Sequence, residues 1–222
     1  MRYQSLVERS KEASSFLNRL KDGFSYLKEN PLILLFGAIS GFVFASILVC
    51  SFFTMPIFIN LYMHGNEGAY GITEASFAFG SLLSGFLILS IFPKNKLTLG
   101  IICLSFLAGL MYLFIGYNTE LVYLYLAYGF IGFANAGIRV MRTTYIFRVI
   151  PNQVVGRTGS VFMVINTLFR IIFIGLFSLS YFSEAANISK TMFILAIFVI
   201  LGGLILLLNF KKLSGLNANY HD

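Results

Sequence analysis

Long apolar runs, separated by short polar segments, dominate the pattern of this 222-residue chain. About 20 apolar residues in a helix cross the roughly 30 Å hydrocarbon core of a bilayer, so each run predicts a membrane-spanning helix. The sequence therefore predicts an all-α polytopic membrane protein with six transmembrane helices. The six runs cover approximately Leu32–Tyr62, Thr73–Phe92, Leu97–Gly116, Leu121–Phe147, Gly159–Phe182 and Ser189–Phe210.

Local signals mark several ends of these runs. The first run follows Asn30-Pro31 and is longer than one crossing requires, so we expect it to tilt or to kink at Pro56. Thr73 has the side chain of an N-cap and Glu74 follows it in the first turn, which predicts the start of the second helix. Pro151 predicts the end of the fourth helix.

The first 30 residues are polar and precede the first apolar run. Apolar residues recur in them at spacings of four, four and three, at Phe16, Leu20, Phe24 and Leu27. This spacing predicts an amphipathic helix, which we expect to lie on the cytoplasmic surface of the membrane; a helix that docks on a partner is the alternative. The predicted organisation is a leader (1–30), a six-helix transmembrane domain (31–212) and a cytoplasmic tail (213–222).

The distribution of positive charge predicts the orientation. The chain has 16 Lys and Arg residues against 9 Asp and Glu. Fourteen of the 16 fall in the leader, the loops or helix ends near 94–96 and 139–157, and the tail, which six crossings place on one side. Basic residues concentrate on the cytoplasmic side, so we expect both termini to be cytoplasmic in a cell (inner) membrane.

The composition removes several classes of function. Only 11% of the residues are charged, which excludes an ordinary water-soluble enzyme, and the apolar runs outweigh the net charge of +7 that could suggest nucleic acid. Cys50 and Cys103 both lie in apolar runs, and His64 and His221 form no recognisable ligand or catalytic spacing. We therefore expect no enzyme activity, no cofactor and no metal site.

Arg170 is a charge deep inside the fifth run. It lies nine residues beyond Val161, or about 14 Å along a helix that enters the hydrocarbon there. Such a charge costs at least about 2.5 kcal/mol, so it should face a cavity or a partner. No Asp or Glu of the chain is expected at this depth. The compensating group can be an anionic substrate, a carboxylate of another bundle or backbone carbonyls.

Other polar residues in the runs are candidates for a substrate pathway. Asn166 lies four residues before Arg170 on the same helical face, which indicates that this face is not exposed to lipid. Asn135, Ser84 and Asn60 are weaker candidates, because polar side chains in membrane helices often only bond to a neighbouring helix.

Arg139 and Arg142 lie three residues apart near the predicted cytoplasmic end of the fourth run. The positive-inside rule explains both residues without a substrate. A gating or anion-attracting role at the inner mouth is the alternative.

Small residues gather in the second and fourth runs and suggest a three-plus-three division of the helices. They allow helices to approach closely, whether the contact is static or slides during a transport cycle. They include Gly80, Ser81, Ser84, Gly85, Gly129, Gly132, Ala134, Ala136 and Gly137.

Short motifs along the chain carry a resemblance to a known family. They are the end of the leader at Lys28-Glu29-Asn30-Pro31, the start of the second run at Tyr70-Gly71-Ile72-Thr73-Glu74-Ala75, the basic loop Pro93-Lys94-Asn95-Lys96 and the segment from Ile150 to Ser160. Together they resemble the C-terminal half of a major facilitator superfamily permease. The last segment is similar to the loop before the penultimate helix of drug and siderophore exporters in that superfamily.

The resemblance implies secondary transport of a small organic compound, in the direction of efflux, by alternating access. A complete permease of this kind has about twelve helices in two halves with the site between them. The chain would then be a fragment, a truncated reading frame or a half-size subunit that needs a complementary six-helix half or a second copy. Pro151, Gly156 and Arg157 would be conformational elements. A non-transporting assembly or regulatory subunit is the alternative function.

Overall fold

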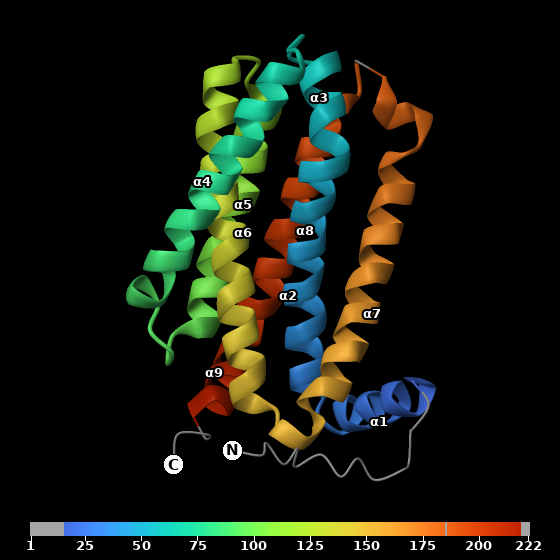
Figure 1. Cartoon of the computed structure of the whole chain (residues 1–222), viewed down its shortest axis with the longest axis vertical. Helices are drawn as coiled ribbons and strands as arrows, with labels where there is room; N and C mark the ends of the chain where they lie inside the picture. Colours follow the sequence, from blue (N-terminus) through green and yellow to red (C-terminus); the bar gives the residue numbers. More distant parts are fainter. Residues whose placement is uncertain (1–15, 185, 219–222) are drawn as a thin grey trace, which may run out of the picture.

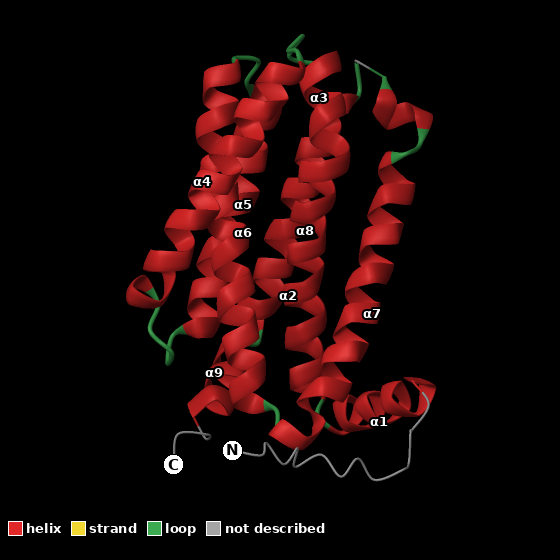
Figure 2. Cartoon of the chain, viewed as in Figure 1, coloured by secondary structure: helices red, strands yellow, loops and turns green. Residues whose placement is uncertain are grey.

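The computed structural model describes residues 16–184 and 186–218 of the chain. The first half of the predicted leader and the end of the predicted tail, with His221, lie outside these residues. The described part consists of helices joined by short loops and contains no strand (Figure 2). Six of its helices are long and apolar enough to cross a membrane. The predicted fold class is confirmed.

The helices form an elongated bundle with a short helix at one end (Figure 1). α1 (Phe16–Glu29) lies across that end, and α9 (Phe210–Ala218) lies at the same end. The first span, Pro31–Leu61, consists of α2 (Pro31–Val49), a π-helical turn η1 (Cys50–Thr54) and α3 (Met55–Leu61). The other elements are α4 (Glu67–Ile91), α5 (Leu97–Tyr117), α6 (Leu121–Val149), α7 (Asn152–Phe177), the 3-10 turn η2 (Ser180–Ser183) and α8 (Ile188–Leu208).

The predicted starts of the second and fifth helices are wrong. The side chain of Asn66 caps α4 by accepting a hydrogen bond from the backbone N–H of Ala69 at 3.0 Å, so this helix begins two turns before Thr73. Thr73 is buried inside α4 and donates its hydroxyl to the Ala69 carbonyl. α7 begins directly after Pro151, because proline fixes a backbone geometry that suits a helix start. Apolar runs mark only the hydrocarbon-crossing part of such helices.

Pro56 distorts the first span as expected, and the distortion takes the form of the π-turn. The N–H of Met55 donates to the carbonyl of Cys50, five residues earlier. In a regular α-helix the ring of Pro56 would press on the carbonyl of Phe52, four residues before it. The wider turn at residues 50–54 relieves that contact and lets the helix continue to Leu61.

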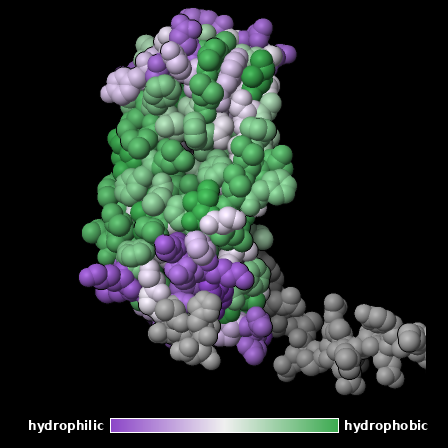
Figure 3. Space-filling view, turned by 90° about the vertical axis from the view of Figure 1, so that its left-hand side faces the viewer, coloured by the Kyte–Doolittle hydropathy of each residue, from purple (hydrophilic) through white to green (hydrophobic). Residues whose placement is uncertain are grey.

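The spans differ in how much of their surface they bury. α2 lies centrally and contacts α6, α7 and α8, whereas α5 packs on α6 and α8. α4 packs chiefly on α6, and α7 rests mainly on α2 and α1. α4 and α7 are therefore the least buried spans. Figure 3 shows the resulting surface as a broad band of apolar side chains between polar ends.

The small residues of the second and fourth spans permit the contact between α4 and α6. A Cβ atom on Gly80 would overlap the carbonyl oxygen of Gly129, and one on Gly132 would overlap the carbonyl of Phe77. The backbones also share a hydrogen bond, since the Ser81 hydroxyl donates to the carbonyl of Gly132 at 3.0 Å. These helices are held together by backbone approach more than by interlocking side chains.

α1 has the amphipathic character that the spacing of its apolar residues predicts. Leu27 is fully buried and Leu20 half-buried, whereas Phe24 is exposed. Gly23 faces the backbone of Arg157 and Thr158, and Asp22 pairs with the Arg157 guanidinium at 3.2 Å. α1 is thereby fixed to the first turns of α7.

Candidate functional site

Arg142 on α6 is a deeply placed cation in the bundle. It lies seven residues before the end of the helix at Val149, or about 10 Å along the axis. Its Nε donates to the Ser40 hydroxyl at 3.0 Å and its Nη2 donates to the Gly37 carbonyl at 3.2 Å. Both acceptors belong to α2. The guanidinium therefore points into the bundle, unlike a basic residue in a cytoplasmic loop.

Aromatic and glycine contacts complete the surroundings of Arg142. The guanidinium carbon lies 5.7 Å from the centroid of the Phe162 ring on α7, a distance at which a cation is attracted to an aromatic face. Gly41 on α2 leaves room beside it, because a Cβ there would lie 3.4 Å from Nη2. Within the described residues no carboxylate pairs with Arg142.

Asn166 on α7 reaches the same stretch of α2. Its side-chain amide donates to the carbonyl of Gly41 at 2.9 Å. A Cβ on Gly41 would lie 3.8 Å from this amide nitrogen and 3.4 Å from Nη2 of Arg142, so both polar groups lie beside one glycine. Asn166, predicted as a pathway residue, thus binds α2 near Arg142, whereas Arg170 on the same helix is exposed.

Arg170 and Arg139, which the sequence also singled out, are exposed side chains. The structure gives neither of them a hydrogen bond or an ion pair within the described residues, and Arg170 has no carbonyl tie to its neighbours there. Arg139 and Arg142 do not act as a pair, because one turns outward and the other turns toward α2. The face of α7 that bears Arg170 is left uncovered by the rest of the described bundle.

Six spans preceded by the amphipathic helix α1 form an architecture that can be compared with known protein families. The family model of the Major Facilitator Superfamily matches residues 4–174, more than half of the chain. The chain belongs to the Major Facilitator Superfamily. Neither a curated protein nor a solved structure matches it. Members of this superfamily are membrane transporters rather than enzymes, so this multi-pass chain is a membrane transporter protein of the superfamily.

Ser84 on α4 and Asn135 on α6 are both buried in this Major Facilitator Superfamily chain. Ser84 is fully buried and Asn135 is 6% exposed. The hydroxyl of Ser84 and the side-chain oxygen of Asn135 have no hydrogen-bond partner within the described residues. Both lie in the stretch between the contact of Ser81 with Gly132 and that of Ile88 with Gly137. The two candidates therefore leave polar atoms unsatisfied at one level of the bundle.

The predicted conformational segment lies where α6 gives way to α7. Pro151 separates the two helices, and Gly156 is exposed with open space around it. Arg157 pairs with Asp22 of α1 and is about half exposed. The contact ties the start of α7 to α1, so a movement of either helix must carry or break it.

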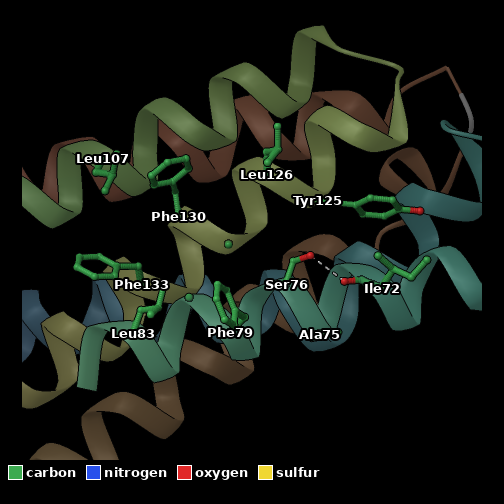
Figure 4. A pocket seen from close by; sticks show the side chains of 12 residues that line it. Ile72, Ala75, Ser76, Phe79, Leu83, Leu107, Tyr125, Leu126, Phe130 and Phe133 are labelled. Carbon is green, nitrogen blue, oxygen red and sulfur yellow. Dashed lines mark hydrogen bonds between the residues drawn. The ribbon is translucent and has the colours of Figure 1, made fainter. Parts of the chain in front are cut away.

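A cavity lies between α4 and α6 on the outside of the bundle, with Leu107 of α5 at its edge. It has a volume of about 730 Å³. Figure 4 shows Phe79 and Leu83 of α4 across from Phe130 and Phe133 of α6, and the lining is almost entirely apolar. No charged side chain lines it. This groove is suited to hydrocarbon and is separate from Arg142.

Sequence reasoning missed a polar cluster in the other half of the bundle. The hydroxyl of Tyr128 on α6 donates to Ser51 in the π-turn at 2.9 Å. Cys50 and Tyr112 are fully buried, and the Tyr112 hydroxyl has no hydrogen-bond partner within the described residues. A helix that starts at Thr73, as the sequence predicts, would have Glu74 in its first turn. The available signal was the Asn66-Glu67 cap, which moves Glu74 two turns inward.

Within the described residues, no three His, Cys, Asp or Glu side chains come together in a metal-binding group. The chemistry that the polar residues offer is electrostatic and hydrogen-bonding. They can bind and release a charged or polar compound.

Proposed function

We propose that the chain exports a small organic compound that carries a negative charge, by alternating access, as one half of a Major Facilitator Superfamily transporter. The observation that carries the proposal is the half-buried guanidinium of Arg142, which points at α2 and which no carboxylate of the described residues neutralises. The second half is a complementary six-helix bundle or a second copy of this chain.

The guanidinium of Arg142 has N–H donors that can bind an anion. A guanidinium has five N–H donors. The Nε–H bonds to Ser40 and one N–H of Nη2 bonds to the carbonyl of Gly37, which leaves the other donors for a ligand. A charge inside a membrane is expensive unless it is paired or marks an ion or substrate pathway. A carboxylate, phosphate or sulfate group on the compound would supply the missing negative charge.

The position of Arg142 also suits a site between two bundles. α6 and α7 both pack on α2 but contact each other little. Transporters of this kind place the substrate between bundles that rock against each other. Asn166 lies at the same level and supplies a side-chain carbonyl oxygen beside its bonded amide.

The segment from Pro151 to Arg157 supports an exporter over an importer. Its residues resemble the corresponding loop of drug and siderophore exporters, and its Arg157 ties α7 to α1 at one end of the bundle. We infer that both termini are cytoplasmic in a cell membrane. The ion pair between Arg157 and Asp22 then lies on the cytoplasmic side, from which an exporter binds its compound.

Transport in everted membrane vesicles tests the proposal, with Arg142→Met as the variant and Arg139→Met as its matched control on the same helix. A panel of fluorescent organic anions and their neutral esters serves as probes. We expect the wild type to accumulate at least one anion and not its ester, the R142M variant to lose at least tenfold of that uptake, and the R139M variant to keep it. Equal uptake by wild type and R142M would contradict the anion site. Absence of any uptake, both by the chain alone and by the chain expressed with a complementary six-helix half, would favour the assembly-subunit alternative.

A further inference from the structure

We propose that the chain binds the headgroup of an anionic phospholipid at four lysines beside α9, at the end of the bundle where α1 and α9 lie. The lysines are Lys94, Lys96, Lys211 and Lys212. They belong to the loop between α4 and α5 and to the first turn of α9. This inference goes beyond transport of an organic compound, because lipid binding can be measured on the chain without any substrate.

Hydrogen bonds hold the two lysine-bearing segments together. The backbone carbonyl of Lys94 accepts a hydrogen bond from Nδ2 of Asn217 on α9 at 2.9 Å, and another from Nη1 of Arg148 on α6 at 2.7 Å. The hydroxyl of Tyr145 on α6 donates to the carbonyl of Leu213 on α9 at 2.9 Å, and both residues are buried. The loop and α9 are therefore fixed on the end of α6 as one surface.

The side chains of all four lysines are exposed on this surface. In the loop, a tight turn brings Lys94 and Lys96 close together, because the N–H of Lys96 donates to the carbonyl of Pro93 at 2.7 Å. On α9, Lys211 lies six residues before Asn217, or about 9 Å along the axis. Both lysines of α9 thus lie within two turns of the residue that contacts the loop.

The protein supplies no negative charge to this lysine patch. None of the four lysines forms an ion pair within residues 16–184 and 186–218. The described acidic residues at this end, Asp22 and Glu29, belong to α1, which packs on α7 and lies on the other side of the bundle from α9 (Figure 1). An uncompensated cluster of positive charge attracts anions.

The opposite end of the bundle has the reverse balance of charge. Glu67, Glu120 and Glu184 lie there, and Lys190 is the basic partner that the described residues provide. A cavity of about 210 Å³ at that end is lined in part by Asn60 and Glu67, and a carboxylate repels a phosphate group. We therefore expect anionic lipid at one end of the bundle.

The depth of the lysines favours a lipid over a soluble anion. Lys94 lies three residues after the end of α4 at Ile91, and Lys211 lies three residues after the end of α8 at Leu208. Ile91 is 53% exposed and Leu208 is 85% exposed. Figure 3 shows hydrophilic side chains directly below the apolar band at this end. A phospholipid can contact the apolar side chains with its tails and the lysines with its phosphate, whereas a soluble anion uses only the lysines.

Lipid retention in detergent micelles tests the proposal. The chain is purified with dioleoylphosphatidylglycerol or, at the same ratio, dioleoylphosphatidylcholine, and native mass spectrometry counts the bound lipids. The K94Q/K211Q variant removes one lysine from each segment, and K94R/K211R keeps the charge. K21Q/K28Q is the matched control, because it removes the same charge from α1, where an acidic residue directly follows each lysine.

We expect the wild type to retain phosphatidylglycerol and not phosphatidylcholine, with retention that declines as salt rises from about 0.1 M to about 0.5 M. A lysine near an anionic lipid surface contributes about fivefold to binding, so K94Q/K211Q should lower the retention at least about tenfold. K94R/K211R and K21Q/K28Q should keep it within about twofold. Melting in phosphatidylcholine micelles checks that each variant is folded.

Three results overturn the proposal. They are equal retention of the two lipids by the wild type, equal retention of phosphatidylglycerol by the wild type and K94Q/K211Q, and an equal loss in K21Q/K28Q. If K94Q/K211Q does not fold, the comparison of lipids and the salt series on the wild type decide the outcome. Stabilisation of the wild type by free glycerol 3-phosphate as strongly as by phosphatidylglycerol would show a soluble-anion site and would also contradict the proposal.

Discussion

The carbonyl oxygen of Gly129 on α6 occupies the space that a side chain on Gly80 of α4 would need. The two backbones therefore approach as closely as glycine allows, and the Ser81 hydroxyl bridges them through the carbonyl of Gly132. α4 has few other partners, so this contact determines whether it stays on the bundle.

We expect Gly80→Ala to destabilise the protein by about 1–3 kcal/mol, because the added methyl group must push the helices apart. Gly85→Ala on the same helix is the matched control, since a Cβ there meets nothing within 4 Å. Thermal unfolding can be followed by the reaction of the buried Cys50 thiol with a dye, in a background where the exposed Cys103 is replaced by Ser. Equal melting of G80A and G85A would contradict the close contact.

We expect the close packing of Gly23 on α7 to hold α1 in position more than the ion pair between Asp22 and Arg157 does. Asp22→Asn removes an ion pair that is about half exposed, so we expect a change below about 1 kcal/mol. Gly23→Val places a branched side chain against the backbone of Arg157, and we expect it to release α1 from α7. Hydrogen exchange of residues 20–29 measures the release. Unchanged protection in the G23V variant would show that α1 is held elsewhere.

Arg170→Leu should leave the fold of the isolated chain intact and favour its insertion. The side chain is exposed on α7 and has no partner within the described residues. On insertion scales, replacement of Arg by Leu at a helix centre gains about 3 kcal/mol. Folding yield in membranes and melting in detergent measure the effect. A collapse of the R170L bundle would reveal a structural tie that the structure does not contain.

Single cysteines in a background without Cys50 and Cys103 test the orientation. We expect Asn118→Cys, after α5, to react with an impermeant maleimide added to intact cells, and Asn95→Cys, before α5, to react only after permeabilisation. The two loops lie at opposite ends of α5, so each controls for the other. The reverse pattern would invert the topology that the positive charges predict.

The six spans could be predicted because their apolar runs exceed what a soluble helix needs, but the orientation of single side chains could not. Arg139 and Arg142 are three residues apart, which turns them about 60° from each other on a helix. That angle is enough to point Arg142 at Ser40 and leave Arg139 exposed. Only the packing of α6 on α2 decides which arginine is buried.

The predicted start of α4 is wrong for a different reason. Thr73 and Asn66 both have cap-forming side chains, and the residues between them are not apolar enough to extend the run. The carbonyl of Ala69 satisfies the Thr73 hydroxyl inside the helix, so the capping role falls to Asn66. The position of Arg170 along its helix could likewise be predicted from the sequence. Its exposure could not, because it depends on which helices pack on α7.

The exposed side of α7 determines how strongly a second helical bundle can bind there. Its exposed side chains include Met163, Leu168, Ile171 and Ile172, which hydrocarbon tails solvate as well as another helix does. A second bundle on this surface would displace lipid, not water, and would gain little from apolar area. Discrimination between protein and lipid must then come from Arg170, because a membrane tail offers it no acceptor. The affinity of two such bundles would therefore rest on a few polar atoms rather than on the apolar area that they bury.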